Sequence, residues 1–166
     1  MGAYYYASGQ RVELERDDEH VAVDRNAAKR AGLEQQIASA PGVAGQRGPM
    51  IVTPRDALDK DALAALRQAG ALQPVYRRNR AIMVPLPEVR VEFDNKQQRQ
   101  KVLKVLAEHK LPPHSIVEKS DDRLVIRAES GSGSDALTIA NEIYEQAGPP
   151  SSSVRFLQFV PKPTLR

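Results

Sequence analysis

The sequence predicts an α+β protein of two tandem ferredoxin-like (βαββαβ-type) units with antiparallel sheets, preceded by an N-terminal β-hairpin. From Glu88 onward the apolar pattern runs strand, helix, strand, strand, helix, strand, which is the split βαβ order of that fold class. A fainter version of this order runs through the first half, where one strand of the repeat is missing. The predicted parts are residues 1–86, residues 87–160 and an extended tail, 161–166.

In the first half, alternation and turn residues predict the elements. Tyr4–Ser8 and Arg11–Arg16 flank a Gly-Gln pair as the two strands of the hairpin. A polar break at 17–20 precedes a short strand, Val21–Asp24, and a helix over Asn26–Ala38. The remaining elements are a strand at Met50–Thr53, a helix capped by Asp56 or Asp59 that faces inward through Ala62, Leu63, Leu66 and Ala69, and strands at Leu72–Arg78 and Ala81–Leu86.

Two prolines, Pro85 and Pro87, are expected to mark the boundary between the units, because proline removes a backbone donor from a strand. Beyond them, alternation of apolar and charged residues over Val89–Phe93 predicts a half-buried strand. The elements expected next are a helix from Asp94 or Asn95 to about His109, strands at His114–Glu118 and Arg123–Ala128, a helix from Ser134 or Asp135 to Gly148, and a strand at Val154–Val160.

Composition limits the classes of function. The balance of 24 basic against 21 acidic residues leaves a formal charge of +3, which is too small a surplus to indicate nucleic-acid binding. The absence of cysteine excludes disulfides and thiolate chemistry and argues against zinc sites. The opening residues do not form a signal peptide, and no stretch approaches the roughly 18 apolar residues of a membrane span. We therefore expect a cytoplasmic protein without a membrane segment.

Candidate catalytic and ligand-binding groups are sparse. His20, His109 and His114 have no partners at metal-ligand spacing, which favours surface roles. Gly131–Ala136 fits the Gly-x-Gly-x-x-Ala pattern of a dinucleotide loop, but no acidic residue follows at the right distance, which favours a flexible connection that ends in a helix cap. No Gly-x-Ser-x-Gly elbow is present. We expect a protein that is not an enzyme and that has no cofactor, metal or small-molecule ligand.

Two features of the sequence could contact a partner. Alternation along the tyrosine run, Tyr4, Tyr5 and Tyr6, puts Tyr5 on the face opposite the other two, and a buried edge strand is the simpler interpretation. Basic residues gather at Arg77, Arg78 and Arg80 and on one helix, at Lys96, Arg99, Lys101 and Lys104. RNA binding on a sheet requires stacking aromatics, and the central strands supply only Phe93, so the basic residues are interpreted as a solvated face.

The last six residues form an extended tail: Pro161, Lys162, Pro163, Thr164, Leu165 and Arg166. The two prolines prevent the tail from continuing a strand ladder and favour an extended backbone. Such a segment is either a disordered end or a strand-like peptide that lies in the groove of another protein.

Several stretches of the chain have a familiar pattern: Arg123–Arg127, Ser130–Ser134, Asp135–Glu145 with the strand to Phe159, Gly70–Arg77, Leu86–Phe93, and Tyr4–Tyr6 with Val21–Val23. Through these stretches most of the chain resembles the N-terminal propeptide region of bacterial subtilisin-like serine proteases. The resemblance implies an inhibitor and folding chaperone whose four-stranded sheet packs on two surface helices of the protease. The tail, 161–166, would occupy the substrate cleft, with Arg166 nearest the catalytic serine. No catalytic domain follows in this chain, and the basic last residue departs from the apolar preference of many subtilisins.

The expected function is therefore binding and inhibition, or chaperoning, of a subtilisin-like serine protease. A first alternative is a protein–protein interaction module of a multiprotein bacterial system, with the tail as a linker remnant. A second alternative is a nucleic-acid-binding ferredoxin-like protein that uses Arg77–Arg80 and the helix over Lys96–Lys104. That alternative predicts an affinity that falls steeply with salt.

Overall fold

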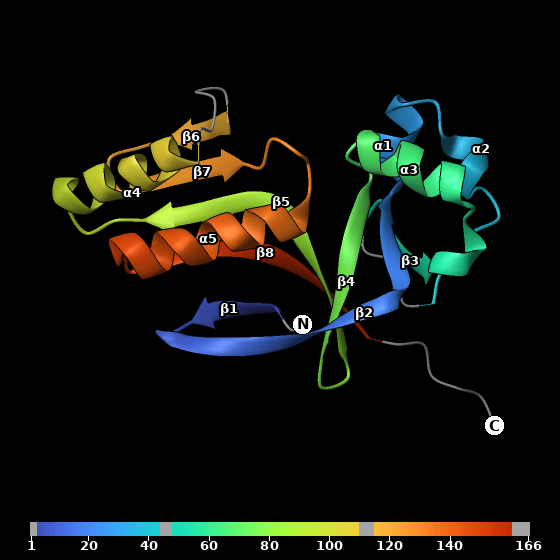
Figure 1. Ribbon diagram of the computed structural model, residues 1–166, viewed down its shortest axis with the longest axis horizontal. Helices are drawn as coiled ribbons and strands as arrows, with labels where there is room; N and C mark the ends of the chain where they lie inside the picture. Colours follow the sequence, from blue (N-terminus) through green and yellow to red (C-terminus); the bar gives the residue numbers. More distant parts are fainter. Residues whose placement is uncertain (1–2, 44–47, 110–114, 161–166) are drawn as a thin grey trace. The chain divides into compact units, whose positions relative to one another are not determined.

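The computed structural model describes residues 3–43, 48–109 and 115–160 and shows a mixed α+β protein (Figure 1). Its strands form an eight-stranded antiparallel sheet with the order β1-β2-β4-β5-β7-β6, in which β3 also pairs with β2 and β8 also pairs with β5. The described chain has five α-helices. The chain groups into two compact units. The first contains Leu14–Pro85 with 156–160, and the second contains Tyr4–Glu13 with Leu86–Arg155.

The first unit is built on antiparallel strands, with Val21 of β2 opposite both Thr53 of β3 and Pro74 of β4. Its core includes Val23, Ala28 and Leu66, all fully buried. The elements of this unit are the C-terminal part of β2 (Gln10–Asp24), α1 (Arg25–Arg30), α2 (Glu34–Ile37), β3 (Met50–Pro54), the 3₁₀ turn η1 (Arg55–Ala57), α3 (Lys60–Gln68), β4 (Leu72–Arg78) and the first part of β5 (Ala81–Glu92).

Local sequence signals set the helix ends of this unit. The Asp59 carboxylate accepts a hydrogen bond from the Ala62 amide at 2.7 Å and caps α3, and Gly70 follows the helix with a φ of 69°. The single helix predicted over Asn26–Ala38 is wrong. Gly32 has a φ of 72°, which interrupts the helical backbone and separates α1 from α2.

Two strands continue through residues at which the sequence predicts a break. β2 continues through the polar residues 17–20, where its register with β4 shifts between Asp17 and Val21. β5 continues through both prolines, so the prediction of separate strands on either side is wrong. The pairing of β5 with β4 ends at Met83, and its pairing with β7 begins at Glu88. The missing proline N–H groups therefore cost no hydrogen bond in either of these ladders.

The described residues of the first unit do not supply the missing strand of the expected repeat. The residues between β3 and α3 are described in full, and they form η1 rather than a strand. The tandem ferredoxin-like arrangement is therefore not confirmed. The predicted boundary at residues 86 and 87 lies beside the division at Pro85 and Leu86, whereas residues 4–13 group with the second unit.

The second unit contains β1 (Ala3–Ala7) from Tyr4 onward, the start of β2, the second part of β5, α4 (Lys96–Glu108), β6 (Ile116–Lys119), β7 (Arg123–Arg127), α5 (Gly133–Ala147) and most of β8 (Ser151–Phe159). The hairpin turns at Ser8 and Gly9, which both have positive φ, as a two-residue turn between twisted strands requires. The Asn95 side chain caps α4 as predicted. The cap of α5 is Ser132, not Ser134 or Asp135, and Gly148 ends that helix in the left-handed region.

None of the helices in the described chain is long and apolar enough to cross a lipid bilayer.

Candidate protein-binding face of the second unit

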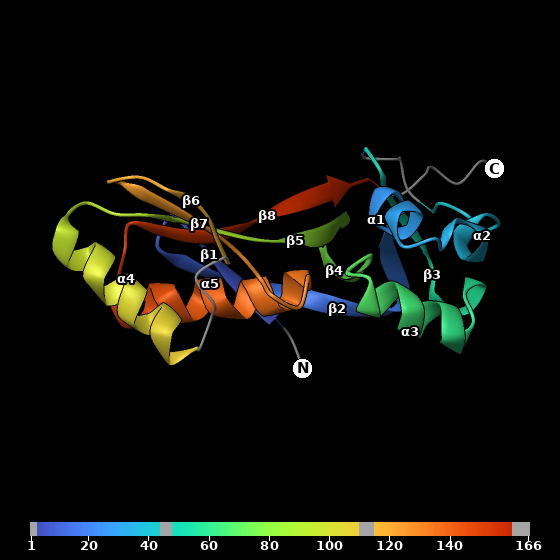
Figure 2. The ribbon, with the colours of Figure 1, turned by 90° about the horizontal axis from the view of Figure 1, so that it is seen from above.

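Both long helices of the second unit lie on the same face of its sheet (Figure 2). Val89 and Val91 of β5 and Leu124 and Ile126 of β7 are fully buried. Successive residues of a strand point to opposite faces, so the residues between these apolar positions lie on the other face. No helix of the described second unit covers that face. It is therefore a candidate surface for contact with a partner.

Charged side chains dominate this face. Residues directly opposite each other in an antiparallel pair share a face, and the register sets Arg90 opposite Val125 and Glu92 opposite Arg123. We name this surface the charged sheet face; it comprises Glu88, Arg90, Glu92, Glu118, Arg123, Val125 and Arg127. The alternation of apolar and charged residues over Val89–Phe93 already predicts, from the sequence, the residues that β5 contributes to the charged sheet face.

Most acids of the charged sheet face lie beside a base of the same face. Arg123 Nη2 lies 2.6 Å from Glu118 Oε1, and Arg127 Nη1 lies 3.8 Å from Glu88 Oε1. These side chains are between 40% and 57% exposed, so each ion pair contributes little to stability, on the order of 0–1 kcal/mol. The pairs instead hold opposite charges in a fixed pattern, which favours a protein partner with a complementary pattern.

The structure explains the tyrosine run as a contact within the second unit. The hydroxyl groups of Tyr4 and Tyr6 both donate to the Glu145 carboxylate of α5, at 3.2 Å and 3.0 Å. The Tyr6 ring stacks on Tyr144, with 4.3 Å between ring centroids. Tyr4 and Tyr6 therefore share one face of β1, as the alternation predicts, and their rings attach the hairpin to α5.

The surroundings of Tyr4 also change its titration. Partial burial and then the nearby Glu145 carboxylate raise the pKa of the Tyr4 hydroxyl above its ordinary value. The Arg11 guanidinium lies 3.7 Å from the centroid of the Tyr4 ring and partly offsets this effect. The tyrosine rings thus stabilise this unit internally, and they leave less aromatic surface free for a partner.

Arg77 and its neighbours do not form a uniform basic surface. Arg77 Nε donates to the Asp17 carboxylate at 2.8 Å, and His20 Nδ1 lies 2.9 Å from the same Oδ2 atom. Burial opposes ionisation of Asp17, but hydrogen bonds from Arg77, His20 and the Glu19 amide outweigh it and hold the pKa of Asp17 below its ordinary value. Arg78 and Arg80 remain exposed around the turn between β4 and β5. This cluster is not predictable from the sequence pattern, because sixty positions separate Asp17 from Arg77.

The remaining candidate groups have structural partners or lie outside the described residues. His109 pairs with Glu142 and joins α4 to α5. Asp135 accepts a hydrogen bond from Ser130 at 2.5 Å, so a carboxylate stands in the first turn of α5, where a dinucleotide phosphate would have to bind. No metal-binding group of three or more His, Asp or Glu residues occurs within 3–43, 48–109 and 115–160. His114 and the tail, 161–166, lie outside the described residues.

Comparisons with protein-family models, with curated proteins and with solved structures return no match for this chain.

Proposed function

We propose that this chain is a non-enzymatic protein that binds and inhibits, or chaperones, a subtilisin-like serine protease through its second unit. The observation that carries the proposal is the helix-free charged sheet face. Propeptides of the family that the sequence resembles use a four-stranded sheet in this way, with the tail in the substrate cleft. The sheet order in this unit and the free face are compatible with that mode of binding.

The proposal includes a ferredoxin-like fold for the second unit. Its strands β8, β5, β7 and β6 are neighbours in that order, and one helix follows β5 and another follows β7. In chain order this reads strand, helix, strand, strand, helix, strand, which is the βαββαβ unit that the sequence predicts. This arrangement places both helices on one face, as Figure 2 shows.

The experiment is an inhibition assay with a purified subtilisin-type protease and three forms of the chain. Removal of 161–166 is expected to weaken inhibition strongly while the circular dichroism spectrum stays unchanged. Arg90→Glu and Arg127→Glu together reverse two charges on the charged sheet face and are expected to weaken inhibition at least tenfold, because like charges then oppose a complementary partner. The matched control is Arg78→Glu with Arg80→Glu, which makes the same change of charge in the first unit.

Two results would refute this proposal. Equal inhibition by the shortened chain would remove the cleft model for the tail, and equal losses in the two charge-reversal variants would remove the charged sheet face as the binding surface. A pull-down that returns no protease would instead favour the interaction module of a multiprotein system. The nucleic-acid alternative loses part of its basic surface, since Arg77 is already paired with Asp17.

A further inference from the structure

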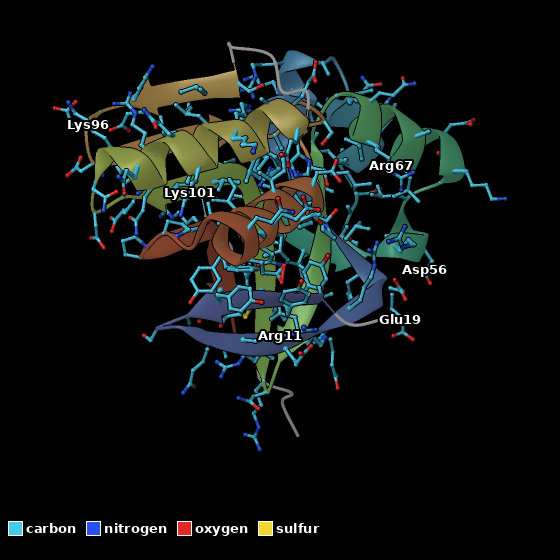
Figure 3. All side chains as sticks on the ribbon, turned by 60° about the vertical axis from the view of Figure 1, so that its left-hand side comes forward. Arg11, Glu19, Asp56, Arg67, Lys96 and Lys101 are labelled. Carbon is cyan, nitrogen blue, oxygen red and sulfur yellow. The ribbon has the colours of Figure 1, made fainter. Side chains whose placement is uncertain are left out.

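Helix α4 carries an unusual concentration of cations. Its basic residues are Lys96, Arg99, Lys101 and Lys104, and its only acid is Glu108, at the last position. Lys96, Lys101 and Lys104 are exposed together with Gln97 and Gln100, and we name these five residues the basic stripe. Figure 3 labels Lys96 and Lys101 along this helix. Among the described residues, none of the four cations has an ion pair, and Arg99 Nε is buried without a hydrogen-bond partner.

The charges of α4 oppose the stability of the helix. Its first turn contains no acid and begins with Lys96, its last turn contains no base, and Glu108 stands at its C-terminus. The helix dipole favours the reverse arrangement, by about 0.3–1 kcal/mol for each charge near an end. Lys96 therefore does not stabilise the free helix, and a partner that supplies negative charge would favour a cation at this position.

The spacing of the cations fits a short anionic segment. Lys96 and Lys104 are eight residues apart, so about 12 Å of helix axis separates their Cα positions. Lys101 and Lys104 are three residues apart and are neighbours on the helix surface, whereas Lys101 is turned by about 140° from Lys96. The two exposed glutamine side chains add neutral donors. Carboxylates on successive turns of an acidic helix repeat at about 5–6 Å and can meet such a row.

The overall charge of the unit favours an acidic protein over a nucleic acid as the partner. Over residues 4–13 and 86–155 the sequence has 12 Asp and Glu against 11 Lys and Arg, so the unit has no surplus of positive charge. Nucleic-acid binding depends on an extended positive field and, for single strands, on stacking aromatics, and the basic stripe has neither. A local row of cations on an otherwise acidic unit instead suits short-range pairing with carboxylates.

We propose that the basic stripe of α4 is a docking surface for an acidic segment of a second protein partner. The stripe and the charged sheet face lie on opposite sides of the second unit, because α4 covers the other face of the sheet. Both surfaces can therefore be occupied at once. In that case the chain binds the protease of the proposed function and also links that protease to an acidic partner.

The probe is a fluorescein-labelled helical peptide with glutamate at every fourth position, compared with the same peptide carrying glutamine. Fluorescence anisotropy at low salt is expected to show binding of the glutamate peptide alone. Lys96→Gln, Lys101→Gln and Lys104→Gln together are expected to weaken it about tenfold, since three exposed pairs are lost. The matched control is Arg30→Gln, Arg78→Gln and Arg80→Gln, which removes the same charge from the first unit and is expected to change the affinity less than twofold.

Each other outcome overturns the proposal. Equal weakening in both triple variants would show an effect of net charge alone, and absence of binding to the glutamate peptide would leave no docking site. Tighter binding of a DNA duplex than of the peptide would assign the stripe to nucleic acid. Protease inhibition by the two triple variants is expected to equal that of the wild type, so failure here is distinguishable from failure of the proposed function.

Discussion

Replacement of Asp17 by asparagine tests whether the charged cluster holds β2 to β4 in the first unit. The Asp17 side chain is 7% exposed and accepts from Arg77 at 2.8 Å, from His20 at 2.9 Å and from the Glu19 amide at 3.0 Å. Asparagine keeps one acceptor oxygen but loses the charge. Hydrogen bonds to charged groups contribute about 1.5–3 kcal/mol, and Arg77 is 34% exposed, so we expect a loss of about 2 kcal/mol.

Urea unfolding at pH 7, followed by far-ultraviolet circular dichroism, measures this loss. With an m-value of about 2 kcal/mol/M, the midpoint is expected to fall by about 1 M. The control is Asp18→Asn, since the Asp18 carboxylate pairs with Arg16 but is 78% exposed, and its loss is expected to stay below about 0.5 kcal/mol. If the two variants unfold at the same urea concentration, the cluster does not stabilise the unit and the reasoning fails.

The lowered pKa of Asp17 adds a prediction about pH. A carboxyl group whose pKa is lower in the folded state stabilises the protein above its unfolded pKa, near 3.8, and this contribution is lost as the pH falls through the folded pKa. The difference in unfolding free energy between wild type and Asp17→Asn should therefore hold from pH 7 to about pH 4 and shrink at lower pH. A difference that grows below pH 4 would contradict the assigned direction.

Four further changes are expected to have measurable effects. Gly148→Ala should cost about 1–2 kcal/mol in urea unfolding, because the residue has a φ of 62° while its added Cβ would meet no atom within 4 Å, so only backbone strain acts. Ser152→Ala should cost about 1 kcal/mol in the same assay, because the buried hydroxyl donates at 2.8 Å to a main-chain carbonyl of α5. Glu145→Gln should let Tyr4 ionise at a lower pH in a spectrophotometric titration, since the carboxylate helps to raise the pKa of that hydroxyl. Lys96→Glu should raise the unfolding free energy by about 0.3–1 kcal/mol, because it places an acid at the N-terminus of α4, and a loss of stability would contradict the dipole argument.

The sequence predicts the parts of this fold that depend on neighbours along the chain. Asp59 and Asn95 cap the helices they precede, and Gly70 and Gly148 follow helices with positive φ. Alternation over Val89–Phe93 separates the buried face of β5 from the charged one. In each case the signal lies within four or five residues, and the physical reason, a cap or a strand period, is local.

Predictions failed where distant residues decide the structure. The polar residues 17–20 predict a break in the strand. In the structure the Asp17 carboxylate accepts a hydrogen bond from Arg77, and β2 continues through these residues. Pro85 and Pro87 read as the end of a strand, but they fall between two ladders of β5. The tyrosine run gives no hint of Glu145, which is 139 positions from Tyr6. The pattern of a single sequence does not indicate such partners, because these residues come into contact only when the chain folds.

The two proposed surfaces of the second unit differ in how their charges are balanced, and binding to them should therefore respond differently to salt. The charged sheet face contains two ion pairs, Glu118 with Arg123 and Glu88 with Arg127. A partner on this face therefore covers neutralised pairs rather than single ions. Added salt should then weaken the net attraction only a little. On α4 the lysines form no ion pair in the described chain, so binding depends on the charge of the partner. Protease inhibition should therefore change little between about 50 mM and 200 mM salt, whereas binding of the acidic peptide should weaken steeply, because the Debye length shortens over that range. Parallel salt responses would show that one surface serves both partners.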